Sequence, residues 1–244
     1  MTAANIEWPE LVGVEGPVAM AHSFDLGDVA DLWPGELDVV ANAVPARRAE
    51  FAAGRACARS ALRRIGAEPV SIVPVGTGPY WARRAPRWPD EVVGSLTHTT
   101  GYAAAVAGRK PDVVSLGLDA ERNEPLPDGI LEHVSLSVER TRVAGLSPGA
   151  GVAWDRLLFS AKEAVFKAWF FVERSWLGFE ECQIDLREEG TFSAWLPERF
   201  LTTPAGRLSH LDGRWFRVER DTTDVLVTLV VVRGRGAPTR ARQG

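Results

Sequence analysis

The segment FSAKEAVFKAWF, residues 159–170, decides how the second half of this chain folds. At about 100° per residue, it predicts a helix with two chemically different faces, within a longer helix over residues 152–173. Glu163 and Lys167 share one face and are four residues apart, so their side chains can touch. Such pairs are most often solvated surface ion pairs, and the helix alone therefore does not define a site. The opposite, apolar stripe consists of Leu158, Ala161, Val165, Ala168 and Trp169.

A second acidic cluster lies upstream of this helix. Residues 113–118 are aliphatic and β-branched, as in a buried strand, and they lead directly into Asp119-Ala120-Glu121. Alternation along a strand places Asp119 and Glu121 on the same face, where their charges repel unless a cation lies between them. Oxygen ligands of this kind suit Mg²⁺. The alternative interpretation is a strand end that turns polar as it leaves the core.

The composition is that of an ordinary globular protein and excludes several classes. With 244 residues the chain is long enough for one large domain or two small ones. The net charge of −4 argues against a general nucleic-acid binder. Cys57 and Cys182 show no metal-binding spacing, which indicates a reduced, cytoplasmic setting. Residues 1–10 lack the basic and apolar regions of a signal peptide, so we expect none. No run of about 18 apolar residues occurs, so we also expect no membrane span.

The first half is rich in groups that bind anions. Pro45 opens a helix with a 3.6-residue period that ends near Gly66, and Arg47 and Arg55 lie within about 80° of each other on it. One face could present both arginines to an anion, although surface arginines mostly serve solubility. The turn SLTHTTG, residues 95–101, offers several hydroxyl groups and a histidine to a phosphate, although a histidine in such a turn more often caps it.

The remaining pattern predicts an α+β fold of two similar halves, related as a pseudo-twofold pair within one chain. Each half contains a helix and strands, with residues 108–112 as the connector. Segments 92–96 and 102–107 are either two strands or a strand followed by a helix, and residues 131–143 include one or two short helices. We expect an N-terminal half over 1–112, a C-terminal half over 113–233 and a disordered tail over 234–244. Further predicted strands are 16–23, 182–186, 191–196, 215–219 and 225–232, and predicted loops are 69–88 and 146–151.

The two halves carry different chemistry. Arginines and the hydroxyl and histidine turn lie in the first half, whereas the second half holds the carboxylates and two lysines. Three carboxylates with lysines fit one Mg²⁺ that bridges phosphate oxygens, and the arginines would hold the rest of a polyanionic ligand. The second-half groups are Asp119, Glu121, Glu163, Lys162 and Lys167.

Four motifs together resemble one family. GLDAE at residues 117–121, followed by FSAKEAVFK at 159–167, resembles the large, single-chain 4′-phosphopantetheinyl transferases. SLTH at 95–98 and RRAEFAAGRACAR at 47–59 are similar to two further segments of that family. WLGFE at 176–180 resembles the subgroup of enterobactin-type and actinobacterial enzymes. The resemblance covers roughly residues 40–185, and the order and spacing of the four motifs make it specific.

The resemblance implies an activity. Such enzymes transfer the 4′-phosphopantetheine arm of coenzyme A to a serine of an apo carrier protein and release adenosine 3′,5′-bisphosphate. It places Mg²⁺ at Asp119, Glu121 and Glu163, with Glu163 also the base for the serine hydroxyl, directly or through water. Lys162 and Lys167 would stabilise charge on the breaking pyrophosphate.

The resemblance also assigns the nucleotide side of coenzyme A. His98 and Thr97 would contact the nucleotide phosphates, and Arg47 and Arg55 the 3′-phosphate region. Arg48 is an alternative to Arg47. Arg83 stands where relatives carry a lysine, so the positive charge is kept, but a planar guanidinium group replaces a compact ammonium group.

Three interpretations of the whole chain stay open at this stage. The first is a Mg²⁺-dependent transferase that acts on acyl or peptidyl carrier proteins of fatty-acid, polyketide or nonribosomal-peptide synthesis. The second is a non-catalytic coenzyme A-binding or carrier-docking subunit, and the third an α+β interaction domain with surface ion pairs. Because one chain contains both halves, we expect a monomer.

Overall fold

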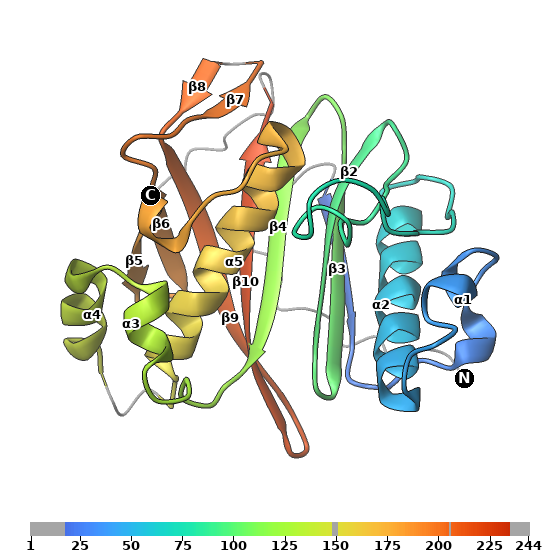
Figure 1. Cartoon of the computed structure of the whole chain (residues 1–244), viewed down its shortest axis with the longest axis horizontal. Coiled ribbons are helices and arrows are strands. Elements are labelled where there is room, and N and C mark those ends of the chain that lie inside the picture. Colours follow the sequence, from blue (N-terminus) through green and yellow to red (C-terminus); the bar gives the residue numbers. More distant parts are fainter. Residues whose placement is uncertain (1–17, 148–150, 205, 235–244) are drawn as a thin grey trace, which may run out of the picture.

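Two antiparallel sheets, each covered by one long helix, form the body of the protein, and a short two-stranded sheet accompanies them (Figure 1). The computed structural model describes residues 18–147, 151–204 and 206–234. Helices and antiparallel strands are both abundant, and the predicted α+β fold class is confirmed. The first sheet has the order β1 (Val18–Ser23), β3 (Tyr102–Arg109), β2 (Val92–Thr99). The second has the order β4 (Val113–Arg122), β10 (Thr223–Arg233), β9 (His210–Arg220), β6 (Thr191–Trp195), β5 (Gln183–Arg187).

One long helix packs on each sheet. Helix α2 (Pro45–Arg64) begins with proline at its first position, where the missing N–H has no helical partner to lose. It packs against β3 and β1. Helix α5 (Trp154–Glu173) packs against β4 and β10, and its predicted existence and end are confirmed.

Three clusters of apolar side chains make the core. One fills the space between α2 and the first sheet, and a second lies between α5 and the second sheet. The third lies between the two sheets and joins Ala104 and Val106 of β3 to Leu116 and Leu118 of β4. Because strand side chains alternate, each sheet faces its helix on one side and the other sheet on the opposite side.

Gly117 allows β4 to approach α5 closely. A Cβ atom at Gly117 would lie 1.8 Å from the carbonyl oxygen of Ala164 on the helix. No side chain fits there, so the glycine of the GLDAE motif sets the distance between strand and helix. Asp119, two residues further along the same face, is thereby brought within reach of side chains on α5.

The structure decides three points about the central elements. On the polar face of α5, Ser160 is fully inaccessible to solvent, whereas Glu163 and Lys167 are half-buried. Strand β4 continues to Arg122, so Asp119 and Glu121 lie inside a strand and not at its end. Residues 102–107, for which a helix was an alternative, belong to strand β3.

Both cysteines, Cys57 and Cys182, are free and buried. Within the described ranges, no helix is both long enough and apolar enough to cross a bilayer. The division into an N-terminal half, 1–112, and a C-terminal half, 113–233, stays a prediction. Parts of the predicted strand, loop and tail, residues 16–17, 148–150 and 235–244, lie outside the described residues.

Shorter elements complete the fold. They are η1 (Val29–Asp31), α1 (Glu36–Val39), α3 (Ile130–Val134), α4 (Ser137–Ala144), η3 (Phe179–Glu181), β7 (Leu201–Thr203) and β8 (Gly206–Leu208).

Candidate active site

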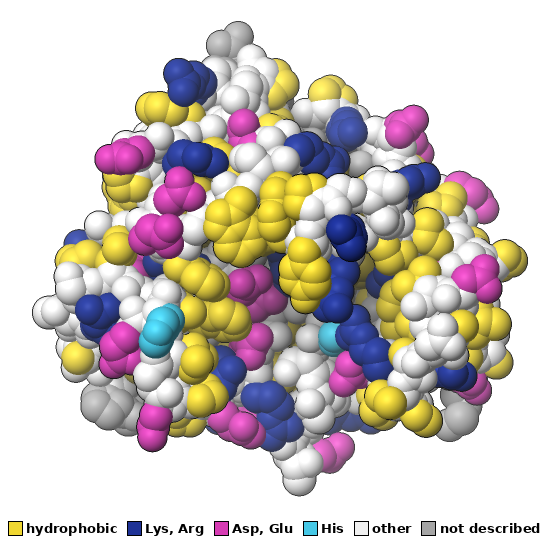
Figure 2. Space-filling view, in the orientation of Figure 1, with side chains coloured by type: hydrophobic (Ala, Val, Ile, Leu, Met, Phe, Trp, Pro, Cys, Tyr) yellow, Lys and Arg dark blue, Asp and Glu magenta, His cyan; other side chains and the backbone are white. Residues whose placement is uncertain are grey.

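A hollow between the two halves gathers charges of both signs. Figure 2 shows acidic side chains in the middle of this face, with lysine, arginine and histidine side chains beside them and a hydrophobic group above. The elements that meet there are β2 from the first half, and β4 and α5 from the second, which are in close contact. The candidate site is therefore built at the junction of the halves.

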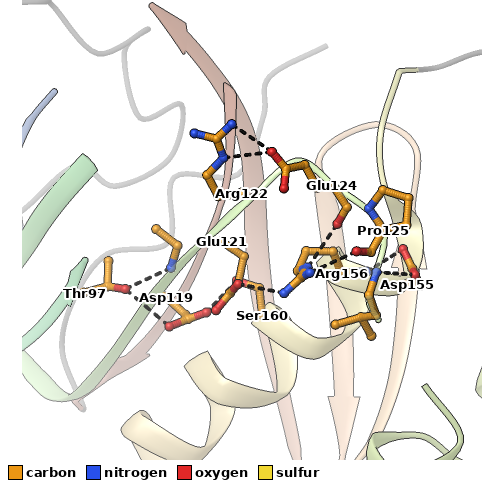
Figure 3. A network of polar contacts seen from close by, with 11 residues as sticks. Thr97, Asp119, Glu121, Arg122, Glu124, Pro125, Asp155, Arg156 and Ser160 are labelled. Carbon is orange, nitrogen blue, oxygen red and sulfur yellow. Dashed lines mark hydrogen bonds and ion pairs between the residues drawn. The ribbon is translucent and has the colours of Figure 1, made fainter. Parts of the chain in front are cut away.

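Asp119 is the centre of a polar network at this junction. Its side chain on β4 is almost completely buried and accepts hydrogen bonds from three residues on two other elements, α5 and β2. Lys167 Nζ of α5 lies 2.7 Å from Oδ1, and Ser160 Oγ, also of α5, donates to Oδ2 at 2.9 Å. Thr97 Oγ1 of β2 donates to Oδ1 at 3.3 Å (Figure 3). A buried carboxylate with these donors is held in one orientation.

Lys167 pairs with Asp119 instead of Glu163. Its ammonium group also donates to the carbonyl oxygen of Leu118 at 2.9 Å and to that of Leu96 at 3.5 Å. The i,i+4 pair that the helix pattern suggests is therefore not formed. Lys167 instead connects α5 to both strands at the junction.

Glu121 lies beside Asp119 on the same face of β4, and its Oε2 is 3.2 Å from Arg156 Nη1 of α5 (Figure 3). Burial, and then repulsion from Asp119, raise the pKa of Glu121 to about 7, although Arg156 opposes the shift. Arg156 is a site residue that the sequence analysis missed. Its position seven residues before Glu163, two helical turns away, was the available signal.

Glu163 of α5 lines a pocket of about 180 Å³. Burial, and then repulsion from Asp119, raise the pKa of this carboxyl group. Within the described chain, Glu163 has no hydrogen-bond or ion-pair partner. Aromatic side chains form much of the pocket, whose other lining residues are Trp81, Lys162, Phe166, Trp176, Leu177, Gly178, Phe179 and Cys182.

The carboxylates suit Mg²⁺ by chemistry, but the three predicted ligands are not gathered into one cluster. Among the described residues, no group of three or more His, Cys, Asp or Glu side chains is placed to hold a metal ion. In proteins Mg²⁺ is commonly bound by one or two carboxylates together with phosphate oxygens. Asp119 and Glu121 provide such a pair, and their mutual repulsion is the charge imbalance that a cation would relieve.

The first half contributes Arg47 and His98, which are in contact with each other. His98 Nδ1 is also 3.5 Å from Glu50 Oε2. Burial, and then the charge of Arg47, lower the pKa of His98 to about 4, so the ring is neutral at pH 7. Arg48 points elsewhere, since its guanidinium group donates to the carbonyl oxygens of Ala43 and Ala41. Of the two alternatives, Arg47 is therefore the one beside His98.

Arg55 and Arg83 differ in their surroundings. Arg55 is buried, donates from Nε to the carbonyl oxygen of Ile72 at 2.6 Å, and lies 3.8 Å from the ring centre of Phe51. Burial lowers its pKa to about 10. Arg83 is exposed in the loop between α2 and β2, where its Nε donates to the carbonyl oxygen of Gly78 at 2.8 Å.

Lys162 is the predicted site residue that the structure keeps apart from the Asp119 network. Its Nζ lies 2.9 Å from Glu139 Oε2 of α4, with both side chains buried. Thr97, in turn, is brought to the site, but its hydroxyl group is engaged by Asp119 and by the N–H of Ala120. Neither the ion pair between Lys162 and Glu139 nor the hydrogen bonds of Thr97 could be read from the sequence, because the partners are 22 or more residues apart.

Comparison with known proteins identifies the same family in both halves. Residues 36–108 match the 4′-phosphopantetheinyl transferase N-terminal domain, and residues 115–215 match the 4′-phosphopantetheinyl transferase superfamily. The chain is 47% identical to 4′-phosphopantetheinyl transferase Svp of Streptomyces mobaraensis, over 77% of this chain and 74% of that protein. It is 42% identical to 4′-phosphopantetheinyl transferase PptT of Mycobacterium tuberculosis, over 77% of this chain and 81% of that protein.

A more distant relative agrees with the subgroup that the sequence suggested. Enterobactin synthase component D of Salmonella typhimurium is 32% identical, over 89% of this chain and 87% of that protein. These similarities extend over most of the chain and of each relative, and they include both halves that form the hollow. The chain belongs to the 4′-phosphopantetheinyl transferase superfamily.

Proposed function

We propose that this protein transfers the 4′-phosphopantetheine arm of coenzyme A to a serine of an apo carrier protein and releases adenosine 3′,5′-bisphosphate. One observation carries the proposal: the Glu163 carboxylate, which has no hydrogen-bond or ion-pair partner among the described residues, lines a pocket next to the ion pair of Asp119 and Lys167. A base, an oriented carboxylate and a cation thus meet where the halves join. Membership in the family supports the reaction type.

Glu163 takes the proton from the attacking serine. A serine hydroxyl is a poor nucleophile at neutral pH, and a positioned base typically accelerates its attack about 10²–10⁴-fold. Glu163 has no partner among the described residues, so its carboxylate is free to accept the proton, whereas the carboxylates of Asp119 and Glu121 are engaged by Lys167 and Arg156.

Cationic groups from both halves hold the phosphates. Lys167 lies partly exposed at the junction, and Arg47 lies on the side of the first half, in contact with the neutral ring of His98. Arg55 and Arg83 add positive charge, Arg55 from a buried position and Arg83 from a loop. A pyrophosphate and a 3′-phosphate on one ligand match this distribution, because anionic oxygens bind best where several cationic donors converge.

Asp119 and Glu121 would hold Mg²⁺, with Glu163 as the third carboxylate of the predicted set. When bound, the ion would neutralise charge on the pyrophosphate as the phosphate ester leaves. Lys167 then has two tasks in this chain: it orients Asp119 and it stays close enough to the hollow to share the charge of the leaving group.

The pocket next to Glu163 suits the uncharged part of coenzyme A. Its wall combines aromatic side chains with the backbone of Gly178.

We further propose that the carrier proteins belong to fatty-acid, polyketide or nonribosomal-peptide synthesis, and that the enzyme acts as a cytoplasmic monomer. Equilibrium sedimentation at micromolar concentration tests the monomer, since a dimer would double the mass.

The decisive test combines the protein with coenzyme A, Mg²⁺ and a panel of apo carrier proteins. The mass of a carrier should rise by one phosphopantetheine arm. Glu163→Gln keeps the shape of the side chain and removes the base, so we expect transfer to fall about 10²–10⁴-fold with unchanged folding. Glu124→Gln, at an exposed carboxylate that pairs with Arg122, is the matched control and should retain full activity.

A non-catalytic coenzyme A-binding subunit is the second candidate. It would bind coenzyme A, as seen in a raised melting temperature, without modifying any carrier. Absence of a mass shift over the whole panel, or normal rates for Glu163→Gln, would reject the proposed chemistry.

A further inference from the structure

We infer that Lys162 is a positioning residue: through a buried ion pair with Glu139 it anchors the pocket wall beside Glu163, and it does not contact the phosphates of the substrate. The inference rests on the proposed function, because the wall belongs to the same pocket. It reverses the role that the family resemblance gives to Lys162 and leaves Lys167 as the lysine at the phosphates.

All three donors of the Lys162 ammonium group are used inside the protein. Nζ lies 2.9 Å from Glu139 Oε2 and donates to the carbonyl oxygens of Phe179 at 2.6 Å and Cys182 at 2.7 Å. Only 2% of the Lys162 side chain is exposed. Because an ammonium group has three N–H donors, none remains for a ligand.

Glu139 extends the anchor to two further elements. Its Oε1 accepts the backbone N–H of Ile184 at the start of β5, at 2.6 Å. Its Oε2 accepts the backbone N–H of Leu136 before α4, also at 2.6 Å. The carboxylate is fully buried, so these bonds and the lysine supply its solvation. One ion pair thus connects α4, α5, η3 and β5.

The segment that this pair holds is the pocket wall. Residues 176–182 run from α5 to β5, and five of them line the pocket that Glu163 also lines. The two carbonyl oxygens that Lys162 binds lie in this segment, at either end of its last turn. Adjacent positions on α5 therefore divide the work: Lys162 fixes the wall, and Glu163 performs chemistry against it.

Three variants test the anchor. Lys162→Met leaves the Glu139 carboxylate buried without its cation, so the wall should loosen and transfer should fall roughly 10²-fold. Glu139→Gln keeps Lys162 but weakens the anchor and should lower transfer by a smaller factor. In the double variant no uncompensated charge remains, and activity should be higher than in Lys162→Met alone, because removing both charges avoids the desolvation penalty.

The matched control is Arg142→Met. Arg142 and Asp185 form an ion pair that also joins α4 to β5, at 3.3 Å, but it is largely exposed. Its loss should change transfer by less than about twofold. A decrease comparable to that of Glu139→Gln would show that any contact between α4 and β5 matters, which would overturn a specific role for the buried pair.

Two measurements separate positioning from phosphate contact. Amide hydrogen exchange in residues 176–184 should be faster in Lys162→Met and Glu139→Gln, and slower again in the double variant. Calorimetric affinity for adenosine 3′,5′-bisphosphate, which lacks the pantetheine arm, should be unchanged in Lys162→Met and weaker in Lys167→Met. Unchanged exchange together with weaker nucleotide binding in Lys162→Met would overturn the inference.

The outcomes remain informative if a variant fails to fold or if the enzyme has another substrate. Glu139→Gln retains the lysine, so it tests the anchor without Lys162→Met, and full transfer in this variant counts against the inference. Hydrogen exchange needs no substrate. Absence of transfer by the wild-type protein would reject the proposed function, while the exchange data would still decide whether the pair holds the wall.

Discussion

Two hydroxyl groups connect the halves at the level of single residues. Thr97 Oγ1 accepts the N–H of Ala120 at 3.0 Å and donates to Asp119, and Ser95 Oγ accepts the N–H of Leu118 at 3.0 Å. Backbone donors on the edge of β4 are thus satisfied by side chains of β2 rather than by another strand. The polar character of residues 95–98 predicted a binding segment, but its partners lie in the other half and could not be read from local sequence.

Thr97→Val should therefore weaken both the fold and the site. It leaves the buried N–H of Ala120 without an acceptor, which costs about 1–3 kcal/mol. It also releases one of the donors that orient Asp119, so transfer should fall. Urea unfolding and the transfer assay measure the two effects. Thr99→Val is the control, because the Thr99 hydroxyl has no hydrogen-bond partner among the described residues, and equal losses in both variants would contradict the role of Thr97.

His98 makes stability depend on pH in a defined direction. Its pKa in the folded protein, about 4, is below the unfolded value near 6.5, mainly because of burial. Between pH 6.5 and 4 the unfolded chain therefore binds more protons, and stability falls as the pH falls through this range. We expect the melting temperature of the wild type to drop more between pH 7 and 5 than that of His98→Asn. Parallel curves would contradict the shifted pKa, with His133→Asn as the control for loss of an exposed histidine.

At the scale of elements, β4 and α5 can pack closely because Gly117 has no side chain. Hydrophobic periodicity predicted both elements, but by itself it left the polar face of α5 open to interpretation as a solvated surface, because no local pattern reveals that β4 lies against that face. Gly117→Ala should force the strand and the helix apart, because the new Cβ would lie 1.8 Å from the carbonyl oxygen of Ala164. We expect a loss of about 1–3 kcal/mol or more, measured by urea unfolding, together with loss of transfer.

Gly54→Ala is the matched control for this prediction. Gly54 lies inside α2, and a Cβ atom there would meet nothing within 4 Å. Alanine is the better helix former, so this variant should gain roughly 0.5–1 kcal/mol. If Gly54→Ala destabilised as much as Gly117→Ala, the close approach at Ala164 would not be the cause.

At the scale of the whole molecule, the apolar layer between the sheets makes the halves interdependent. Leu118, fully buried in this layer, is in contact with residues of both sheets, so Leu118→Ala should cost about 2–5 kcal/mol. Fluorescence and far-UV circular dichroism should still report one coincident transition. Val138→Ala, at a partly exposed site on α4, should stay within about 0.5 kcal/mol. Separate transitions would show that the halves unfold independently.

The two-part pattern of helix and strands was visible in the sequence because it depends on local periodicity. The way the halves meet was not, because it depends on contacts such as Leu96 with Lys167, 71 residues apart. The chemistry of the site followed the residue types, since carboxylates and lysines keep their character in any fold. Their pairing did not, and Lys162 and Arg156 show that a charged side chain next to a motif can serve structure or function.

The hydroxyl bonds of Ser95 and Thr97 give the molecule a natural place to be divided. Among the described residues, only side chains make hydrogen bonds between β2 and β4 there, and residues 110–112 connect the two halves. A protein cut at this point and fused to two interacting partners would bring Thr97 back beside Asp119 and Lys167 only on reassembly. Such a split enzyme would convert proximity between the partners into a covalent label on a carrier protein.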